Sequence, residues 1–161
     1  MNRCAVNIKG TRQGQFAGEL QIRGREAWSA ALRFAMQVNA PRDPATGMAT
    51  GRRRYQPIRI TKEWGAASPQ ILTAMATNEV LNPIVMEFTR TNPNGEEAVS
   101  QRITLTNAVV SDISRSHEAG TAGAGTDVVE LEEISFVFEK ITVEDVMGGK
   151  TFSDNWSDGQ G

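Results

Sequence analysis

The segment that decides the fold is residues 80–111, which read VLNPIVMEFTRTNPNGEEAVSQRITLTNAVVS. Apolar side chains in both of its arms alternate with polar ones, at Ile84, Met86, Phe88, Ile103 and Leu105. This alternation is typical of half-buried β-strands. Between the arms, Asn94-Gly95 tolerates the positive φ angles of a tight hairpin turn. The segment therefore predicts two antiparallel strands, over residues 80–90 and 98–111.

The same alternation continues outward in both directions and predicts further strands at residues 4–8, 27–38, 52–61, 128–139 and from 141 onward. Residues 27–38 are predicted as one long strand, because apolar side chains occupy every second position. Within 128–139 the apolar positions change phase, which predicts a β-bulge. Cys4 alternates with apolar neighbours and is expected to be a small buried residue.

A single helix is predicted over about ten residues from Ser68. Serine is a good N-cap, and Pro69 suits the first helical position. One face is apolar, at Ile71, Leu72 and Met75. So short a helix must gain its stability by packing on a sheet. The pattern as a whole predicts a closed or sandwiched antiparallel sheet with a helix over one edge.

The chain of 161 residues is expected to form a single domain, residues 1–161. Two flexible loops are predicted at about 40–51 and 118–127, and a polar C-terminal tail at about 148–161. The first loop contains prolines, which cannot donate to a sheet ladder. The second is rich in glycine and alanine, which is typical of a flexible connector.

Composition excludes several function classes. The formal charge of −2, from 17 basic and 19 acidic residues, gives no electrostatic case for binding nucleic acid or a membrane surface. With Cys4 as the single cysteine and His117 as the single histidine, there is no internal disulfide, thiolate zinc cage or multi-histidine metal site. The sequence contains no Sec-type signal peptide and no run of about 20 apolar residues. We therefore expect a soluble protein made in the cytoplasm.

Catalytic motifs are weak. His117 lies beside Glu118 and near Ser111, Ser114 and Ser116, but no G-x-S-x-G elbow accompanies it. A solvated histidine is the favoured interpretation, and a hydrolase-like effector that uses His117 is the alternative. Residues 120–125 are glycine-rich but lack the lysine and the following helix of a phosphate loop.

Two charge runs stand out, a basic one at Arg52, Arg53 and Arg54 and an acidic one at Glu130, Glu132 and Glu133. A basic run can bind phosphate, and paired carboxylates can bind cations or transfer protons. A solvated or partner-facing strand surface is the favoured interpretation of both. Complementary runs on one chain are also what a self-associating ring or filament would use.

The order and spacing of several segments resemble the Hcp family, the tube protein of bacterial type VI secretion. The segments that carry the resemblance are Pro41–Pro44, Thr50–Arg53, Pro57-Ile58, Ile60–Glu63, Ser68–Leu72, Ile103–Ala108, Glu132–Phe136 and Asp154–Trp156. Trp64-Gly65 departs from the acidic residue common after Glu63. The stretch around Ala35 and Met36 lacks the polar residues often found there, and residues 119–125 have an unusual Gly/Ala-rich composition.

The resemblance implies a mainly β fold, an antiparallel two-sheet β-barrel with one short flanking α-helix. It further implies homo-hexameric rings that stack into a hollow tube, a contractile sheath, a VgrG-type spike protein and small effector proteins in the lumen. It implies no enzymatic activity, no cofactor and no metal, and release without a cleaved signal. The alternative is a tube protein of a phage tail or another contractile injection particle.

Three groups of residues are then candidate surfaces. Pro41, Arg42, Asp43 and Pro44 lie in a loop that could reach a neighbouring subunit or ring. The basic run could meet the acidic run of a neighbour in a heterologous contact. The candidate lumen face, which is small and polar, comprises Arg33, Ala35 and Gln37.

Overall fold

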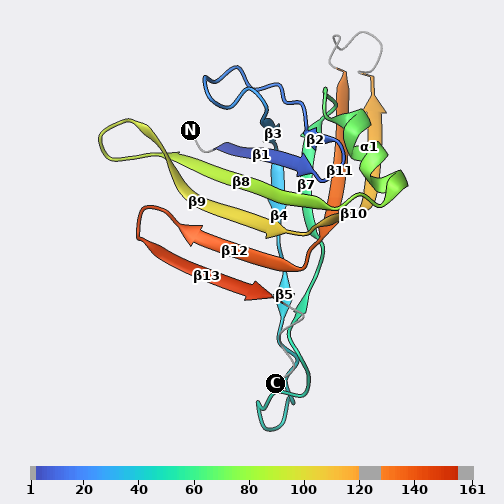
Figure 1. The fold of residues 1–161 in the computed structure, drawn as a ribbon. Helices are drawn as coiled ribbons and strands as arrows, with labels where there is room; N and C mark the ends of the chain where they lie inside the picture. The colour runs from blue at the N-terminus through green and yellow to red at the C-terminus, as the bar shows by residue number, and fades with distance from the viewer. Residues whose placement is uncertain (1–2, 120–127, 156–161) are drawn as a thin grey trace.

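The computed structural model describes residues 3–119 and 128–155 (Figure 1). Within them the elements are β1 (Arg3–Gly10), β2 (Gly14–Gln15), β3 (Ser29–Ala31), β4 (Arg33–Ala35), β5 (Val38–Asn39), β6 (Arg54–Tyr55), β7 (Ile58–Glu63), α1 (Ser68–Thr77), β8 (Leu81–Thr91), β9 (Glu97–Thr106), β10 (Val109–Glu118), β11 (Val129–Val137), β12 (Lys140–Asp145) and β13 (Lys150–Asn155). The predicted mainly β barrel with one short helix is confirmed.

The strands form three antiparallel sheets. The largest has seven strands in the order β13-β12-β9-β8-β1-β2, with β3 also paired to β1; the second has the order β10-β11-β7-β4, and β5 pairs with β6 in the third. In Figure 1 the strands of the large sheet run across the page, while those of the four-stranded sheet run up it. The two sheets therefore cross at a steep angle, as in orthogonal packing. Apolar side chains from both fill the space between them.

The hairpin of β8 and β9 supplies the centre of the large sheet. Ile84 and Met86 stand opposite Leu105 and Ile103, and all four are buried. The turn uses Gly95 at φ 83°, where an L side chain would be strained. The predicted return strand is wrong in one respect, because residues 98–111 belong to two strands. The chain turns at Asn107, whose φ of 50° asparagine tolerates, and continues as β10 in the other sheet.

The predicted long strand over residues 27–38 is also wrong. Its first part, β3, pairs with β1, whereas β4 pairs with β7 in the other sheet and β5 pairs with β6. Between β3 and β4, Leu32 is exposed while its N–H donates to the carbonyl of Thr61. Odd-numbered residues, Ser29 and Ala31, face the core before this point, and an even-numbered residue, Phe34, faces it afterwards. This corner joins the two sheets, and strict alternation in the sequence conceals it.

Helix α1 has the predicted bounds but a different N-terminus. The N-cap residue is Ala67, and Ser68 is buried within the first turn. The Ser68 hydroxyl accepts a hydrogen bond from the N–H of Gly65 and donates one to Glu132, at 2.8 Å. The first turn of the helix is therefore hydrogen-bonded to β11. Ile71 and Ala74 form the buried apolar face of the helix.

The phase change predicted as a bulge in residues 128–139 has another cause. Even-numbered residues of β11 face inward throughout, and one of them, Glu132, is a buried acid. It stands opposite Lys62 of β7, which is buried too. The irregularity lies instead in β10, where the register shifts between Val110 and Asp112 and leaves Ser111 as an additional residue. Because a charged residue, Glu132, occupies one of the inward positions, the apolar pattern in the sequence looks as if it changed phase.

The predicted polar tail begins with an ordered strand. Residues 150–155 form β13, which pairs with β12 from Asp145↔Lys150 to Lys140↔Asn155. A strand of mostly polar residues can form there because β13 is an edge strand of the large sheet and most of it is exposed. The remaining tail residues, 156–161, and most of the predicted 118–127 loop lie outside the described residues.

Candidate assembly surfaces

The segment predicted as a flexible loop at 40–51 is the far part of a two-stranded ribbon that projects from the barrel (Figure 1). Strands β5 and β6 pair at its base, and the bridge Arg42↔Ala49 continues the pairing outward. At the tip Met48 is 69% exposed. We define the ribbon as residues 38–55.

Asp43 closes the tip of the ribbon. Its backbone N–H donates to the carbonyl of Met48 at 2.8 Å, and its carbonyl accepts from the N–H of Gly47 at 2.7 Å. Its side chain accepts from the N–H of Ala45 at 2.9 Å. Gly47 has a φ of 73°, which suits glycine. Of the four predicted contact residues, Asp43 therefore maintains the turn, whereas the exposed Arg42 and Pro44 are available for contact.

A clamp fixes the base of the ribbon to β13. The guanidinium of Arg53 donates to both carboxylate oxygens of Asp154, and the hydroxyl of Tyr55 donates to the same carboxylate. Hydrogen bonding from Arg53 holds the pKa of Asp154 below its usual value. Burial, reinforced by Asp154, raises the pKa of Tyr55 to about 12. Arg53 thus acts within its own chain, which removes it from the predicted contact patch, while Arg52 and Arg54 are exposed.

The three predicted acidic residues do not form one surface. Because alternate residues of a strand face opposite sides, Glu130 and Glu132 share the inner face and Glu133 lies on the outer one. Glu132 is 2% exposed; its carboxylate lies 2.9 Å from the Lys62 ammonium and 3.3 Å from Arg115. The prediction that Glu132 meets a neighbouring subunit is therefore wrong. The signal for this pair was present in the sequence, because Lys62 and Glu132 continue the inward phase of their strands.

The outer face of the four-stranded sheet carries the predicted lumen residues. Arg33 stands opposite Thr61, and Ala35 stands opposite Arg59. Together with Glu133 these four residues line a shallow depression. Gln37 is exposed beyond the end of β4. This face is polar and mixed in charge, whereas the other face of the same sheet is part of the core.

His117 has no serine beside it on its face of β10. Ser114 and Ser116 occupy the alternate positions and therefore point to the other face. The His117 imidazole lies 3.8 Å from the Glu130 carboxylate, and its ring centroid is 6.0 Å from that of Trp64. This arrangement matches a solvent-exposed contact between an imidazole and a carboxylate better than a nucleophile with its base.

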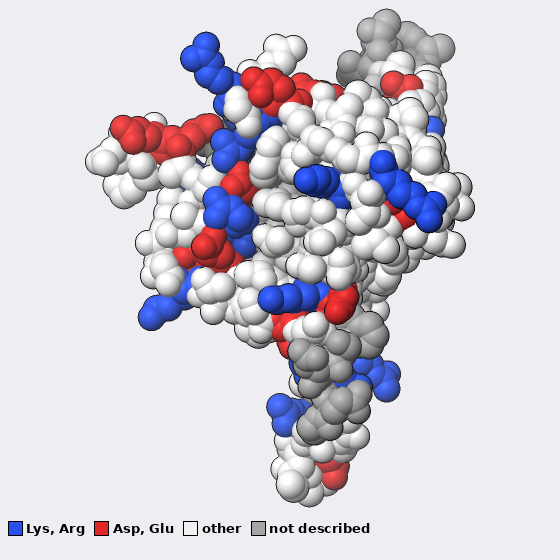
Figure 2. Space-filling model, in the orientation of Figure 1, with Lys and Arg blue, Asp and Glu red and all other residues white. Residues whose placement is uncertain are grey.

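A row of charges that was not predicted from the sequence crosses the outer face of the large sheet. Glu87 accepts from Arg25 and Arg102, and Arg102 also donates to Glu144. Figure 2 shows basic and acidic side chains alternating down this face. Burial alone would raise the pKa of Glu87, but the bonds from the two arginines outweigh it and lower that pKa.

The family model "Type VI secretion system effector, Hcp" matches residues 6–144. The chain belongs to the Hcp family. It is 29% identical to the "Major exported protein" of Pseudomonas aeruginosa over 160 residues, which covers 94% of this chain and 93% of the relative. Membership connects the protein to the type VI secretion system, in which Hcp is a tube protein and is exported.

Solved Hcp structures have the same fold. A crystal structure described as Hcp protein superimposes with a TM-score of 0.87 at 21% identity, over 97% of this chain and 98% of the other. The secreted protein Hcp3 of Pseudomonas aeruginosa gives 0.78 at 25% identity, over 97% and 99%. Within the described part of this Hcp chain, no helix has the length and apolar character that a membrane span requires. The described residues also bring together no cluster of three metal-ligating side chains.

Proposed function

We propose that this Hcp protein is the structural subunit of a type VI secretion tube, in which hexameric rings stack around a lumen lined by the outer face of the four-stranded sheet. The supporting observation is the contrast between the two faces of that sheet. One face packs on the apolar core and includes the buried Lys62–Glu132 pair, whereas the other presents Arg33, Arg59, Glu133 and Thr61 to solvent. A polar wall of this kind suits a water-filled channel that carries small effector proteins.

Ring closure needs two different surfaces on each subunit. The four-stranded sheet ends in β10 on one side and in β4 on the other. Each edge strand presents backbone groups that can pair with another chain. We infer that unlike edges meet around the ring, so that six subunits close it head to tail.

Stacking uses the two ends of the same sheet. The exposed Arg52 and Arg54 lie at the ribbon end of β7, whereas Glu130 and Glu118 lie at the opposite end, where β10 and β11 meet the 118–129 connection. Basic and acidic ends attract when identical rings stack in one direction. The ribbon then reaches toward a neighbouring subunit or ring.

The proposal includes the partners that a type VI tube requires, a VgrG-type spike at the tip and a contractile sheath around the outside. The subunit has no catalytic role in it. Replacement of His117 by alanine should therefore leave assembly and secretion unchanged, as measured by the amount of the protein released from secreting cells.

The first experiment is light-scattering mass after gel filtration, with negative-stain images of the same peak. We expect a sixfold mass and annular particles. A monomer at all concentrations up to millimolar, without annular particles in the images, would contradict the proposal.

Charge reversal tests the stacking contact separately. Glu118→Lys, at the exposed acidic end of the sheet, should leave single rings intact, shorten the stacks and reduce the salt dependence of stacking, because it removes an attraction between rings. Arg53 is unsuitable for this test, since its reversal would also break the clamp to Asp154. Stacks of unchanged length and salt response in Glu118→Lys would contradict the assigned contact.

A further inference from the structure

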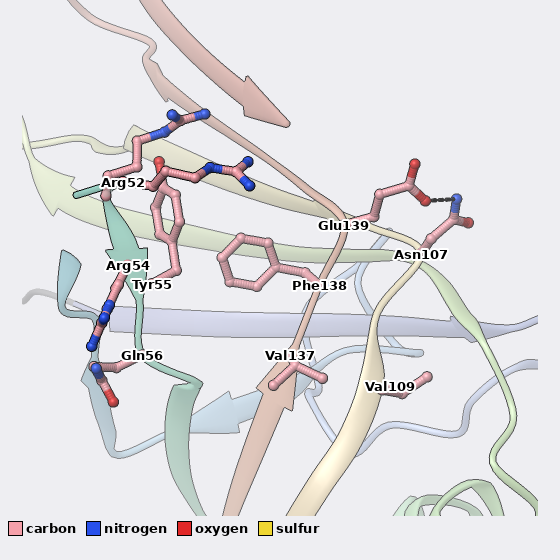
Figure 3. A pocket seen from close by; sticks show the side chains of 10 residues that line it. Arg52, Arg54, Tyr55, Gln56, Asn107, Val109, Val137, Phe138 and Glu139 are labelled. Carbon is pink, nitrogen blue, oxygen red and sulfur yellow. Dashed lines mark hydrogen bonds between the residues drawn. The ribbon is translucent and has the colours of Figure 1, made fainter. Parts of the chain in front are cut away.

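A pocket of about 760 Å³ lies at the base of the ribbon, and its interior is apolar. Figure 3 shows the rings of Tyr55 and Phe138 next to each other in its wall, with Val137 and Val109 on the side of the four-stranded sheet. The rim is polar: Arg52 and Arg54 lie on the ribbon side, and Asn107 and Glu139, joined by a 2.9 Å hydrogen bond, lie opposite. The volume falls in the range of about 300–1,000 Å³ typical of sites that enclose a ligand or a few side chains.

The walls of the pocket are fixed before anything binds. The rings of Tyr55 and Phe138 pack edge to face with centroids 5.5 Å apart. The Tyr55 hydroxyl and Arg53 are both held by Asp154, so the ribbon side cannot swing away without breaking the clamp. A preformed pocket requires little ordering of side chains on binding, which favours affinity.

The β12–β13 turn exposes two apolar side chains. Val146 and Met147, 38% and 49% exposed, follow Asp145 at its tip. The turn is rigid, because the Val146 N–H donates to the carbonyl of Ser100 at 2.9 Å and the Gly149 N–H donates to that of Asp145 at 2.8 Å. Two apolar side chains behind an acidic one match an apolar pocket with arginines on its rim.

The turn and the pocket of one chain cannot meet. Figure 1 places the β12–β13 turn at the free end of the large sheet, and the strands β12 and β13 run from there to the end that lies beside the ribbon. We propose that the Val146–Met147 turn of one Hcp subunit inserts into the ribbon-base pocket of the next. Such a contact joins two different patches, which is the arrangement that closes a ring. This inference rests on the proposed function and names a side-chain contact within the ring.

Substitution of the inserted side chain provides the first test. Met147→Lys places a charge in the apolar pocket near two arginines, and we expect the ring mass in light scattering to fall to that of the monomer. Leu72→Lys on α1 is the matched control, because Leu72 is 40% exposed and lies away from both patches; it should keep the ring mass. Equal circular dichroism and melting temperatures establish that both variants fold.

Disulfide trapping provides a test that does not depend on disruption. Met147→Cys combined with Val109→Cys should give, under oxidation, a ladder of covalent oligomers up to the hexamer, while each single variant gives none above the dimer. Retention of rings by Met147→Lys, together with no ladder, would overturn the inference and leave the tube proposal intact. A wild-type chain that never forms rings would instead contradict the tube proposal.

The chain's own residues 156–161 are the competing occupant, since β13 ends at Asn155 beside Arg53. The double-cysteine chain is therefore also made with these six residues removed. A ladder in both lengths supports insertion of the neighbouring turn. A ladder that appears only after the removal would show that the end of the chain fills the pocket, and would overturn the inference.

Discussion

Two charged clusters in this protein use the same chemistry in opposite surroundings. In the barrel, Lys62 and Glu132 form an ion pair at 2% exposure, with Ser68 and Arg115 also bonded to the carboxylate. At the base of the ribbon, Arg53 and Tyr55 hold Asp154 near the surface. The first cluster is inside the body and the second connects the body to a projection.

Because the two clusters differ in burial, their loss should affect different properties of the protein. A buried charge that loses its partner has no water to replace it, so the pair in the barrel affects the stability of the whole domain. Water reaches the clamp, so its loss should affect the position of the ribbon more than the stability of the barrel. Four predictions test this contrast, from the largest expected effect on folding to the smallest.

Glu132→Gln should lower the free energy of unfolding by about 3–5 kcal/mol, because the buried Lys62 charge loses its nearer carboxylate and keeps only Glu19, at 3.9 Å. Denaturant unfolding measures the loss. The control Glu130→Gln removes a half-exposed carboxylate on the same strand face and should change stability by about 0–1 kcal/mol. Equal effects of the two substitutions would contradict a special role for burial. The double variant Lys62→Met, Glu132→Leu should recover most of the loss.

Asp154→Asn should release the ribbon while leaving the barrel folded. We expect faster hydrogen exchange at the amides of residues 38–55 and little change at those of β8 and β9. The same release should follow acidification: the pKa of Asp154 is depressed in the folded state, so its stabilisation is complete above the ordinary value of about 3.9 and is lost as the pH falls through the lower folded value. Uniform exchange in both regions would contradict a local clamp.

Tyr55 is the single tyrosine of the chain, so its titration can be followed by absorbance at 295 nm without interference. The midpoint should lie near 12 in the folded protein. In Asp154→Asn it should fall but stay above the ordinary value of about 10, because burial, the largest single cause of the raised pKa, is retained. A midpoint near 10 in the unmodified protein would show that the clamp and the pocket wall are open.

The rates at which cysteines in the barrel and in the ribbon react with a disulfide reagent provide the last comparison. The substitution that it requires should have almost no effect on folding. Cys4 is half-buried, not fully buried as predicted, yet burial raises its pKa to about 12. Almost no thiolate forms at neutral pH, and a disulfide reagent should modify it far more slowly than an ordinary cysteine. In Met48→Cys the added thiol lies at the exposed ribbon tip and should react at the rate of an ordinary cysteine. Rapid modification of Cys4 in the folded protein would show that the barrel opens at β1.

Local patterns in the sequence were enough to predict the β8–β9 hairpin and the bounds of α1. In both, propensity, turn chemistry and burial agree, as with Asn94-Gly95 between two alternating arms. The pattern could not show which sheet a strand joins. Residues 27–38 alternate without interruption, yet the chain changes sheets at Leu32, because pairing with β1 or β7 depends on residues far away in the sequence.

The candidate surfaces were predicted in part. Arg33 and Ala35 share an outer face because period-two alternation is a local property of a strand. The partners of the charge runs were not local: Arg53 pairs with Asp154 about 100 residues away, and Glu132 pairs with Lys62 on the neighbouring strand β7, which is distant in the sequence. No local feature marks the partner of a charge, although the inward phase of Lys62 and Glu132 was a usable sign of burial.

The additional residue in β10 has an evolutionary consequence. An insertion or deletion within a strand normally transfers every following side chain to the other face. Here Val110 and Ile113 both face inward with Ser111 and Asp112 between them, and Phe136 and Ile134 opposite have only Ser135 between them. A lineage could therefore lose Ser111 in one step, at the expense of one hydrogen bond to Ser135, and every other residue of the strand would keep its face.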